Sequence, residues 1–331
     1  MNEIQETVVS GMRPTGPLHL GHYFGVIENW KRLQKEYRCF FFVADWHALT
    51  SEYASPQRIK GFSRELLIDW FSAGLDPEGA VFFVQSQIKE HAELSLLFSM
   101  LTPLGWLERN PTYKDVKQEL VSKDLNTFGF LGYPVLMSAD ILIYKAKRVP
   151  VGEDQLPHLE ICREIARRFN YLYSPVFPEP QAILTEASRL AGLDGRKMSK
   201  SYGNAIYLGE EMEEVRKKVF SMLTNTQRKT LKDPGDPAMC NLFPYFEIVD
   251  PHGEYEDIVE GCKKATWGCK DCKKLLFSKL EEFLEPIHQK RKELEGDPSL
   301  IEEVTTQGRE RAREIASQTM EEVRKAVNLN Y

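Results

Sequence analysis

Short apolar segments alternate with amphipathic ones through the first half of the chain. TVVSGM (7–12), CFFFVADW (39–46) and AVFFVQS (80–86) have the length and apolar character of buried strands. Between them, apolar residues recur at the spacing of one buried helix face. These faces are formed by Leu20, Phe24, Ile27 and Trp30, and by Phe62, Leu66, Trp70 and Ala73. Because strands that alternate with helices assemble into parallel sheets, this order predicts a doubly wound, Rossmann-like α/β domain.

The second half of the chain has a different pattern. From about residue 210 onward the strand signals fade, and three segments show the periodicity of amphipathic helices: 210–223, 272–295 and 301–327. We therefore expect a Rossmann-like domain over 1–205, followed by an all-helical domain over 206–331.

Charge and hydropathy exclude several classes of protein. The chain carries a net charge of −6, so a generally basic surface that coats nucleic acid is excluded. Residues 1–10 are polar and acidic, unlike a secretory signal. The apolar runs are shorter than the roughly 18 residues that span a membrane. We expect a soluble cytoplasmic protein without a membrane partner.

Two histidines follow the first predicted strand. In a doubly wound sheet, the carboxyl ends of the strands and the helix N-termini beside them bind anions. His19 and His22 would share one helix face there, and Gly21 would let a phosphate approach the backbone. The segment is neither a G-x-G-x-x-G motif nor a P-loop. Taken alone, such a pair can equally be surface or capping histidines.

A basic loop lies at the junction of the two predicted domains. DGRKMSKSYGNAI (194–206) has no apolar periodicity, and it holds Lys197 and Lys200 three residues apart. By itself the segment would be a solvated basic loop. However, His-x-Gly-His after the first strand, followed by Lys-Met-Ser-Lys-Ser after the α/β domain, resembles the paired signature of class I aminoacyl-tRNA synthetases. This resemblance implies that the loop closes over bound ATP, with hinge freedom from Gly192, Gly195 and Gly203.

The resemblance also implies which residues act on ATP. A carboxylate that attacks the α-phosphorus needs positioning and preorganised positive charge more than acid or base groups. Mg²⁺ and the lysines would supply that charge to the departing pyrophosphate, with the histidines as hydrogen-bond donors. The implied catalytic residues are His19, His22, Lys197 and Lys200. The implied ATP contacts are Arg13, Pro14, Thr15, Gly21, His22, Gly152, Glu153, Asp154, Lys197, Met198, Ser199, Lys200 and Ser201.

Within that class, residues 132–170 resemble the core of bacterial tryptophanyl-tRNA synthetases, and the resemblance extends from GMRPTG to EVRKAVNL. It implies a tryptophan–tRNA ligase, which makes tryptophanyl adenylate from tryptophan and ATP and passes the acyl group to tRNA(Trp). Asp140 would accept the indole N–H. The other residues implied for the tryptophan pocket are Tyr133, Met137, His47, Val149, Val151 and Gln155. Many bacterial members have Thr-x-Gly-Asn in place of His-x-Gly-His, so the partners of His22 are left open.

Other assignments stay open for these residues. A buried carboxylate that needs a donor rejects phenylalanine, but tyrosine also carries a donor, so a tyrosyl-tRNA synthetase-like ligase is an alternative. Asp140 can also be a helix N-cap. A non-catalytic RNA-binding paralogue is a further alternative, although such a protein would usually lose the motif lysines or histidines.

Four of the six cysteines lie close together in the second half. Cys240, Cys262, Cys269 and Cys272 have the spacing C-x21-C-x6-C-x2-C, which suits either Zn²⁺ or a [4Fe–4S] cluster. In a reducing cytosol, clustered cysteines more often hold metal than form disulfides. The arrangement is similar to that of a cluster-bearing subset of tryptophanyl-tRNA synthetases, which implies [4Fe–4S] rather than zinc.

The segment around these cysteines is basic. A basic patch with an interleaved aromatic side chain suits the phosphates and bases of single-stranded RNA. We expect it to bind the tRNA anticodon through Lys263, Lys264, Trp267, Lys270 and Lys273.

Residues from about 75 to 135 resemble the dimer-forming region of the family, which implies a homodimer.

Overall fold

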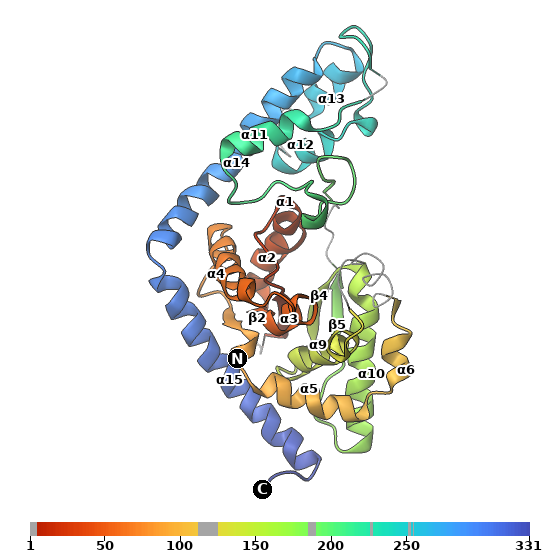
Figure 1. Ribbon diagram of the computed structural model, residues 1–331, viewed down its shortest axis with the longest axis vertical. Helices are drawn as coiled ribbons and strands as arrows, with labels where there is room; N and C mark the ends of the chain where they lie inside the picture. The colour runs from red at the N-terminus through yellow and green to blue at the C-terminus, as the bar shows by residue number, and fades with distance from the viewer. Residues whose placement is uncertain (1–4, 112–124, 185–189, 226–227, 251–252, 254) are drawn as a thin grey trace.

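The computed structural model describes residues 5–111, 125–184, 190–225, 228–250, 253 and 255–331 (Figure 1). Its centre is a parallel sheet of five strands: β1 (Thr7–Met12), β2 (Arg38–Val43), β3 (Val81–Val84), β4 (Arg148–Val151) and β5 (Gln181–Leu184). The strand order is β3-β2-β1-β4-β5, with Val9 opposite Phe40 and Phe40 opposite Val81. The doubly wound fold predicted from the sequence is confirmed. Because the order reverses between β1 and β4, the carboxyl ends of these strands flank the crevice where such sheets bind ligands.

Alternate residues of the strands face two separate cores. Val8 belongs to one core and the adjacent Val9 to the other, as the period of two in a strand requires. On the first face, Trp30 stacks on Phe41 with the ring centroids 4.2 Å apart. Among the helices of the first half, α2 (Glu28–Glu36) and α4 (Gln57–Ser72) contribute to this face. On the second face they are α5 (Glu90–Leu101), α9 (Tyr133–Leu142) and α10 (Leu156–Leu172).

The helix after β1 changes its winding as it proceeds. It begins as α1 (Leu20–His22), continues as a π-helical turn over Tyr23–Ile27 and becomes α2. The sequence predicted one regular amphipathic helix here. A π turn rotates the residues that precede it relative to those that follow, and such turns often mark functional sites.

The second half contains the three predicted helices, which are α11 (Met212–Ser221), α14 (Cys269–Gly296) and α15 (Ser299–Ala326). It also contains α12 (Phe243–Val249) and α13 (Tyr255–Lys263), which were not predicted from the sequence. The helices α11, α12 and α13, with the start of α14, form a narrow end of the molecule away from the sheet (Figure 1). α14 then runs back along α4.

α15 returns to the α/β domain and packs against β3 and α5. Gly308 comes so close that a Cβ at this position would overlap the carbonyl oxygen of Phe82. Arg324 donates to both carboxylate oxygens of Glu93, at 2.7 and 2.6 Å. The helical half is therefore divided between the narrow end and the sheet, a division that its periodicity did not indicate.

Short elements complete the described part of the chain. They are α3 (Asp45–Glu52), α6 (Leu104–Glu108), α8 (Phe128–Leu131) and 3₁₀ turns at Gln85–Gln87, Glu153–Gln155, Lys200–Tyr202 and Pro237–Met239. In the described ranges, no helix has both the length and the apolar character needed to cross a membrane. Residues 112–124, within the predicted dimer-forming insertion, lie outside the described residues.

Candidate active site

A cavity of about 470 Å³ lies at the carboxyl ends of β1 and β4. Its walls come from the turn after β1, from the helix that follows, and from α3, α9 and β4. The seven residues predicted for tryptophan all line this cavity: His47, Tyr133, Met137, Asp140, Val149, Val151 and Gln155. Four of those predicted for ATP also line it: Arg13, Thr15, His22 and Gly152. The fold thus brings both predicted sets to one place.

Asp140 is buried in the cavity wall and held by three side chains. His47 Nε2 lies 2.7 Å from Oδ2, and His91 Nδ1 lies 2.6 Å from Oδ1. Gln85 Nε2 donates to both oxygens, at 2.7 and 2.9 Å. Burial opposes ionisation, but the hydrogen bonds from the two histidines outweigh it and lower the pKa of Asp140 to about 2. The carboxylate is therefore an anionic acceptor. It lies inside α9, whose N-cap is Gly132, so the N-cap alternative is wrong.

A second buried histidine orients two other cavity residues. His158 Nδ1 lies 3.0 Å from Gln155 Oε1, and its Nε2 lies 2.5 Å from the Tyr133 hydroxyl. Burial lowers the pKa of His158 to about 4. A neutral ring that donates from Nδ1 to the amide oxygen must accept at Nε2 from the hydroxyl. The tautomer of His158 thus fixes the orientation of both side chains.

The two motif histidines do not point side by side into the cavity. Their rings stack, with centroids 3.7 Å apart, and His22 lines the cavity while His19 is buried. Burial, reinforced by the nearby ammonium of Lys200, lowers the pKa of His19 to about 4 and that of His22 well below its ordinary value. His22 Nδ1 accepts the backbone N–H of His19 at 3.3 Å, so its Nε2 carries the proton. His22 is therefore a neutral donor.

The basic loop packs against the helix start that holds these histidines. Met198 is buried, and its Sδ accepts the backbone N–H of Gly21 at 3.4 Å. Lys200 donates from Nζ to the carbonyl oxygen of Gly16 at 2.7 Å. Burial lowers the pKa of Lys200 to about 8, although Asp69 opposes this shift. Lys197, by contrast, is exposed. The described loop therefore brings Lys200, but not Lys197, against the turn after β1.

Asn204 organises the turn of this loop. Its Oδ1 accepts the backbone N–H of Ser199 at 2.9 Å, and its Nδ2 donates to Asp194 Oδ1 at 2.7 Å. A Cβ on Gly192 would overlap the Asn204 amide, so this glycine serves close packing rather than the predicted hinge. Gly195 and Gly203 have positive φ angles of 80° and 63°, which glycine adopts most readily.

The remaining residues predicted for ATP surround the cavity less directly. Pro14 is buried in the turn after β1, while Glu153 and Asp154 are exposed in the 3₁₀ turn after β4. Asp154 accepts from Gln155 Nε2 at 2.9 Å. The side chain of Ser201 lies outside the described residues.

The four clustered cysteines converge in the narrow end of the molecule. Cys240, Cys262 and Cys272 are buried, and each of the four thiols interacts electrostatically with the other three. Burial, followed by the neighbouring sulfurs, raises the pKa of Cys272 to about 12. Among the described residues, however, no group of three or more His, Cys, Asp or Glu side chains is placed to hold a metal ion. The sulfurs are gathered without forming a ligand set, so neither [4Fe–4S] nor Zn²⁺ is supported by this geometry.

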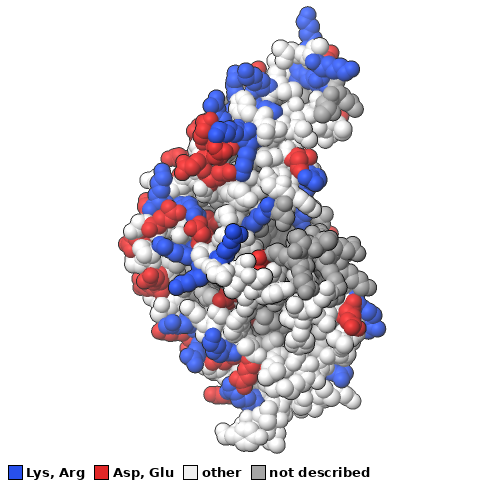
Figure 2. All heavy atoms as spheres, viewed as in Figure 1, with Lys and Arg blue, Asp and Glu red and all other residues white. Residues whose placement is uncertain are grey.

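The basic segment is only partly available to a partner. Figure 2 shows lysine and arginine side chains gathered at the narrow end, where Figure 1 places α13. Lys263, Lys264 and Lys270 are exposed. Lys273, by contrast, donates to the carbonyl oxygen of Phe220 at 2.7 Å. Trp267 is half-buried, and its ring occupies the space that a Cβ on residue 261 would need. It is part of the packing and not a free stacking surface.

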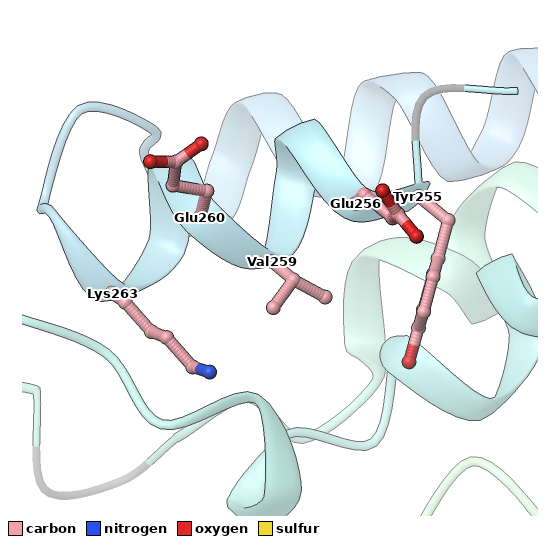
Figure 3. A pocket seen from close by; sticks show the side chains of 5 residues that line it. All are labelled: Tyr255, Glu256, Val259, Glu260 and Lys263. Carbon is pink, nitrogen blue, oxygen red and sulfur yellow. The ribbon is translucent and has the colours of Figure 1, made fainter.

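A second, shallower hollow of about 290 Å³ lies beside α13. It is lined by Tyr255, Glu256, Val259, Glu260 and Lys263. Figure 3 shows Tyr255, Val259 and Lys263 projecting from the same side of the helix, whereas Glu260 points away. Glu260 forms an ion pair with Lys264. Of the lysines predicted for RNA, Lys263 thus lines a hollow that also contains Tyr255, with Val259 between the two (Figure 3).

Sequence reasoning missed several residues of the site. They are Asp69, Gln85, His91, Tyr144, His158, Asn204 and Arg291. One signal was present: Asp69 is a charged residue within the apolar segment LLIDWF, and buried carboxylates need partners. Gln85, His91, Tyr144 and Arg291 have no local signature, because their partners are distant in the chain.

The fold and the cavity agree with the comparisons to known proteins. The model of the family described as "tRNA synthetases class I (W and Y)" matches residues 1–285, and the chain belongs to this family. The tryptophan–tRNA ligase of Thermotoga maritima is 52% identical over 98% of this chain and 99% of its own length. That of Aquifex aeolicus is 48% identical over 97% of this chain and 99% of its own length. The tryptophanyl-tRNA synthetase of Campylobacter jejuni complexed with ADP and tryptophan has a TM-score of 0.90 and 34% identity, covering 98% of this chain and 100% of its own.

Proposed function

We propose that this protein is a tryptophan–tRNA ligase, which forms tryptophanyl adenylate from tryptophan and ATP and transfers the acyl group to tRNA(Trp) in the cytoplasm. The full-length similarity to tryptophan–tRNA ligases supports this activity. The observation that carries it is the ionised, buried carboxylate of Asp140 at the wall of the cavity. An anionic acceptor there favours a substrate with an N–H donor over one without it.

The activation step follows from the residues around the cavity. The tryptophan carboxylate attacks the α-phosphorus of ATP, an oxygen–phosphorus bond forms, and pyrophosphate departs with the electrons of the broken bond. Mg²⁺ bound with ATP supplies positive charge to the phosphates. His22 donates from Nε2, and Lys200 exchanges the Gly16 carbonyl for a phosphate oxygen. Both groups stabilise the negative charge that grows on the leaving group. Lys197 would join them as the loop closes.

Pyrophosphate exchange measured separately with tryptophan and with tyrosine tests the activity. We expect exchange with tryptophan and at least about 100-fold less with tyrosine. Because tyrosine also carries a donor, this discrimination has to come from the shape of the cavity. Charging of tRNA(Trp) then separates a ligase from an enzyme that only forms adenylates. Equal exchange with tyrosine would favour the tyrosyl alternative, and no exchange with either would favour the RNA-binding paralogue.

The four-cysteine cluster is proposed as a metal-binding site, with [4Fe–4S] as the predicted group and Zn²⁺ as the alternative. The C-x21-C-x6-C-x2-C spacing and the mutual proximity of the four thiols motivate this proposal. Arg228 Nη1 lies 4.0 Å from Cys269 Sγ, at the edge of the cluster. Iron, sulfide and zinc analysis of anaerobically purified protein tests it. Protein that contains none of the three would contradict the proposal. For variants that remove a cysteine of the cluster, Cys162→Ala is the matched control, because it removes a buried thiol outside the cluster.

The exposed lysines at the narrow end are proposed to bind the tRNA anticodon region. We expect the triple variant Lys263→Ala, Lys264→Ala and Lys270→Ala to raise KM for tRNA. The slope of the logarithm of the tRNA binding constant against the logarithm of the salt concentration should become less steep. We expect a change of roughly 0.7 for each phosphate that the variant no longer neutralises. Exchange with tryptophan should be unchanged, because the segment from α13 to the start of α14, which carries these lysines, lies at the narrow end away from the sheet (Figure 1). Unchanged tRNA kinetics would refute this role. Replacement of Lys290 and Lys292 on α14 by alanine is a control for the removal of surface charge.

A homodimer is proposed through the exposed apolar side chains of α5, α6 and α8. These side chains are Leu96 (58%), Met100 (72%), Leu104 (56%) and Phe128 (78%). Exposed large apolar side chains are typical of protein interfaces. Sedimentation should therefore give the mass of a dimer for the native chain and of a monomer for Phe128→Asp. Tyr171→Asp, at an exposed aromatic residue on α10, is the matched control and should stay dimeric. A native monomer would contradict the proposal.

A further inference from the structure

The two oxygens of Asp140 have different surroundings. Oδ2 faces His47, which lines the cavity. Oδ1 faces His91, which is fully buried, and Gln85 bridges both oxygens from a fully buried position. The histidine partner of Oδ2 thus lies at the cavity wall, while the histidine partner of Oδ1 lies in the protein interior.

His91 is itself held by a third side chain. Its Nε2 lies 2.7 Å from the hydroxyl of Tyr144, which is also buried. Burial raises the pKa of Tyr144 well above its ordinary value, so the hydroxyl keeps its proton and can donate. If Nε2 accepts that proton, the neutral ring carries its own proton on Nδ1 and donates it to Asp140. The chain of donors runs from Tyr144 through His91 to the carboxylate.

Rotation of the carboxylate is restricted by this arrangement. The terminal torsion of an aspartate is soft, so a carboxylate with one partner can turn to meet donors from several directions. Donors on both oxygens, two of them on rigid buried side chains, remove that freedom. An acceptor with a fixed direction discriminates between a donor in the right place and one that is displaced by an ångström.

We propose that His91, oriented by Tyr144, is a positioning residue that aims Asp140 at the indole N–H and thereby sets selectivity for that donor. The inference rests on the proposed tryptophan–tRNA ligase activity. His91 does not touch the substrate. It acts by holding Oδ1, so that Oδ2, which His47 and Gln85 also contact, keeps one orientation relative to the cavity when a substrate N–H approaches.

Pyrophosphate exchange with a substrate that lacks the N–H gives the decisive readout. In β-(3-benzothienyl)alanine, sulfur replaces the indole N–H while the ring shape is kept. The native enzyme should prefer tryptophan to this analogue. We expect His91→Leu to reduce that preference, measured as the ratio of kcat/KM values, by at least about tenfold, because a loosely held acceptor no longer rewards the donor. KM for ATP should change little.

Two further variants keep the test informative if His91→Leu fails to fold. Tyr144→Phe removes only the hydroxyl and should reduce the preference by a smaller factor. His91→Asn keeps an N–H close to the position of Nδ1 and should restore part of what His91→Leu loses. The matched control is Ser138→Ala on α9, which removes a buried hydroxyl bonded to Pro134 O at 2.7 Å. It should leave the preference at the native value.

The outcomes separate this inference from the proposed function. Absence of tryptophan-dependent exchange in the native enzyme would overturn the function. Normal native exchange, together with an unchanged preference in both Tyr144→Phe and a folded His91 variant, would overturn the positioning role alone. An equal loss of preference in Ser138→Ala would show a general packing effect and would also overturn it.

Discussion

Arg291 on α14 forms an ion pair with Asp69 on α4, whose other oxygen accepts the backbone N–H of Leu18 at 2.8 Å. Leu18 immediately precedes His19, so one buried carboxylate connects the long C-terminal helix to the start of the motif helix. Arg291 also pairs with Glu65 and Glu295. Nearby on α14, His288 Nε2 lies 2.8 Å from the carbonyl oxygen of Leu208. The backbone N–H of Leu208 in turn donates to the carbonyl oxygen of Leu18. α14 is therefore part of the framework of the active site.

Replacing only one partner of the Arg291–Asp69 ion pair should destabilise the protein more than replacing both. Arg291→Met leaves Asp69 buried without its cation, and we expect it to lower the free energy of unfolding by about 3 kcal/mol. The double variant with Asp69→Asn should recover most of that loss, because the amide oxygen can still accept from Leu18. Urea unfolding of the single and double variants gives the coupling free energy. Strictly additive losses would show that the two side chains act independently.

Lys200→Ala should slow activation without weakening ATP binding. Its ammonium rests on the Gly16 carbonyl and gains its main value when charge develops on pyrophosphate. We expect kcat for tryptophan-dependent exchange to fall by about 100-fold or more, with less than about a threefold change in KM for ATP. Lys292→Ala, an exposed lysine on α14, should behave as the native enzyme. Native exchange kinetics in Lys200→Ala would remove this lysine from the mechanism.

Buried neutral histidines should make the protein sensitive to acid. The pKa of His158 is lowered from 6.5 to about 4, chiefly by burial. Between these values the unfolded chain binds more protons than the folded one, so the free energy of unfolding falls as the pH falls through this window. His158→Gln should reduce the pH slope by up to about 1.4 kcal/mol per pH unit. Denaturant titrations between pH 4 and 7 measure the slope, and identical slopes for both proteins would contradict the assignment.

Gly308→Ala should destabilise the packing of α15. Its methyl group would overlap the Phe82 carbonyl oxygen, and backbone on both sides would have to move. Overpacking of this kind costs about 1–3 kcal/mol. Gly61→Ala in α4 is the matched control, because nothing lies within 4 Å of the new methyl group, and it should stabilise the protein by about 0.5–1 kcal/mol. Thermal unfolding of the two variants should therefore shift in opposite directions.

The sequence allowed prediction of those features that depend on local pattern. The alternating strands and helices predicted the sheet, and the motif at His19 is a short, ordered signature. The residues around Asp140, which line the cavity, were predicted through the family resemblance of the segment that contains most of them. The anchors of Asp140 were not found, since His91 and Gln85 come from separate segments that only the fold brings together. The return of α15 to β3 was likewise invisible, because an amphipathic helix shows that it has a partner but not which one. Asn204 in the basic loop was missed for the opposite reason: its contacts are local, but they need a turn whose shape depends on side-chain hydrogen bonds.

The position of α15 affects how such a chain is made. β3 leaves the ribosome early, and the helix that covers it follows every other described element. Until α15 has emerged from the exit tunnel, a growing chain carries an uncovered strand, which invites association with neighbouring nascent chains. Completion of the α/β domain therefore has to wait for the C-terminal helix, and chaperones that shield the strand in that interval should raise the yield of folded protein.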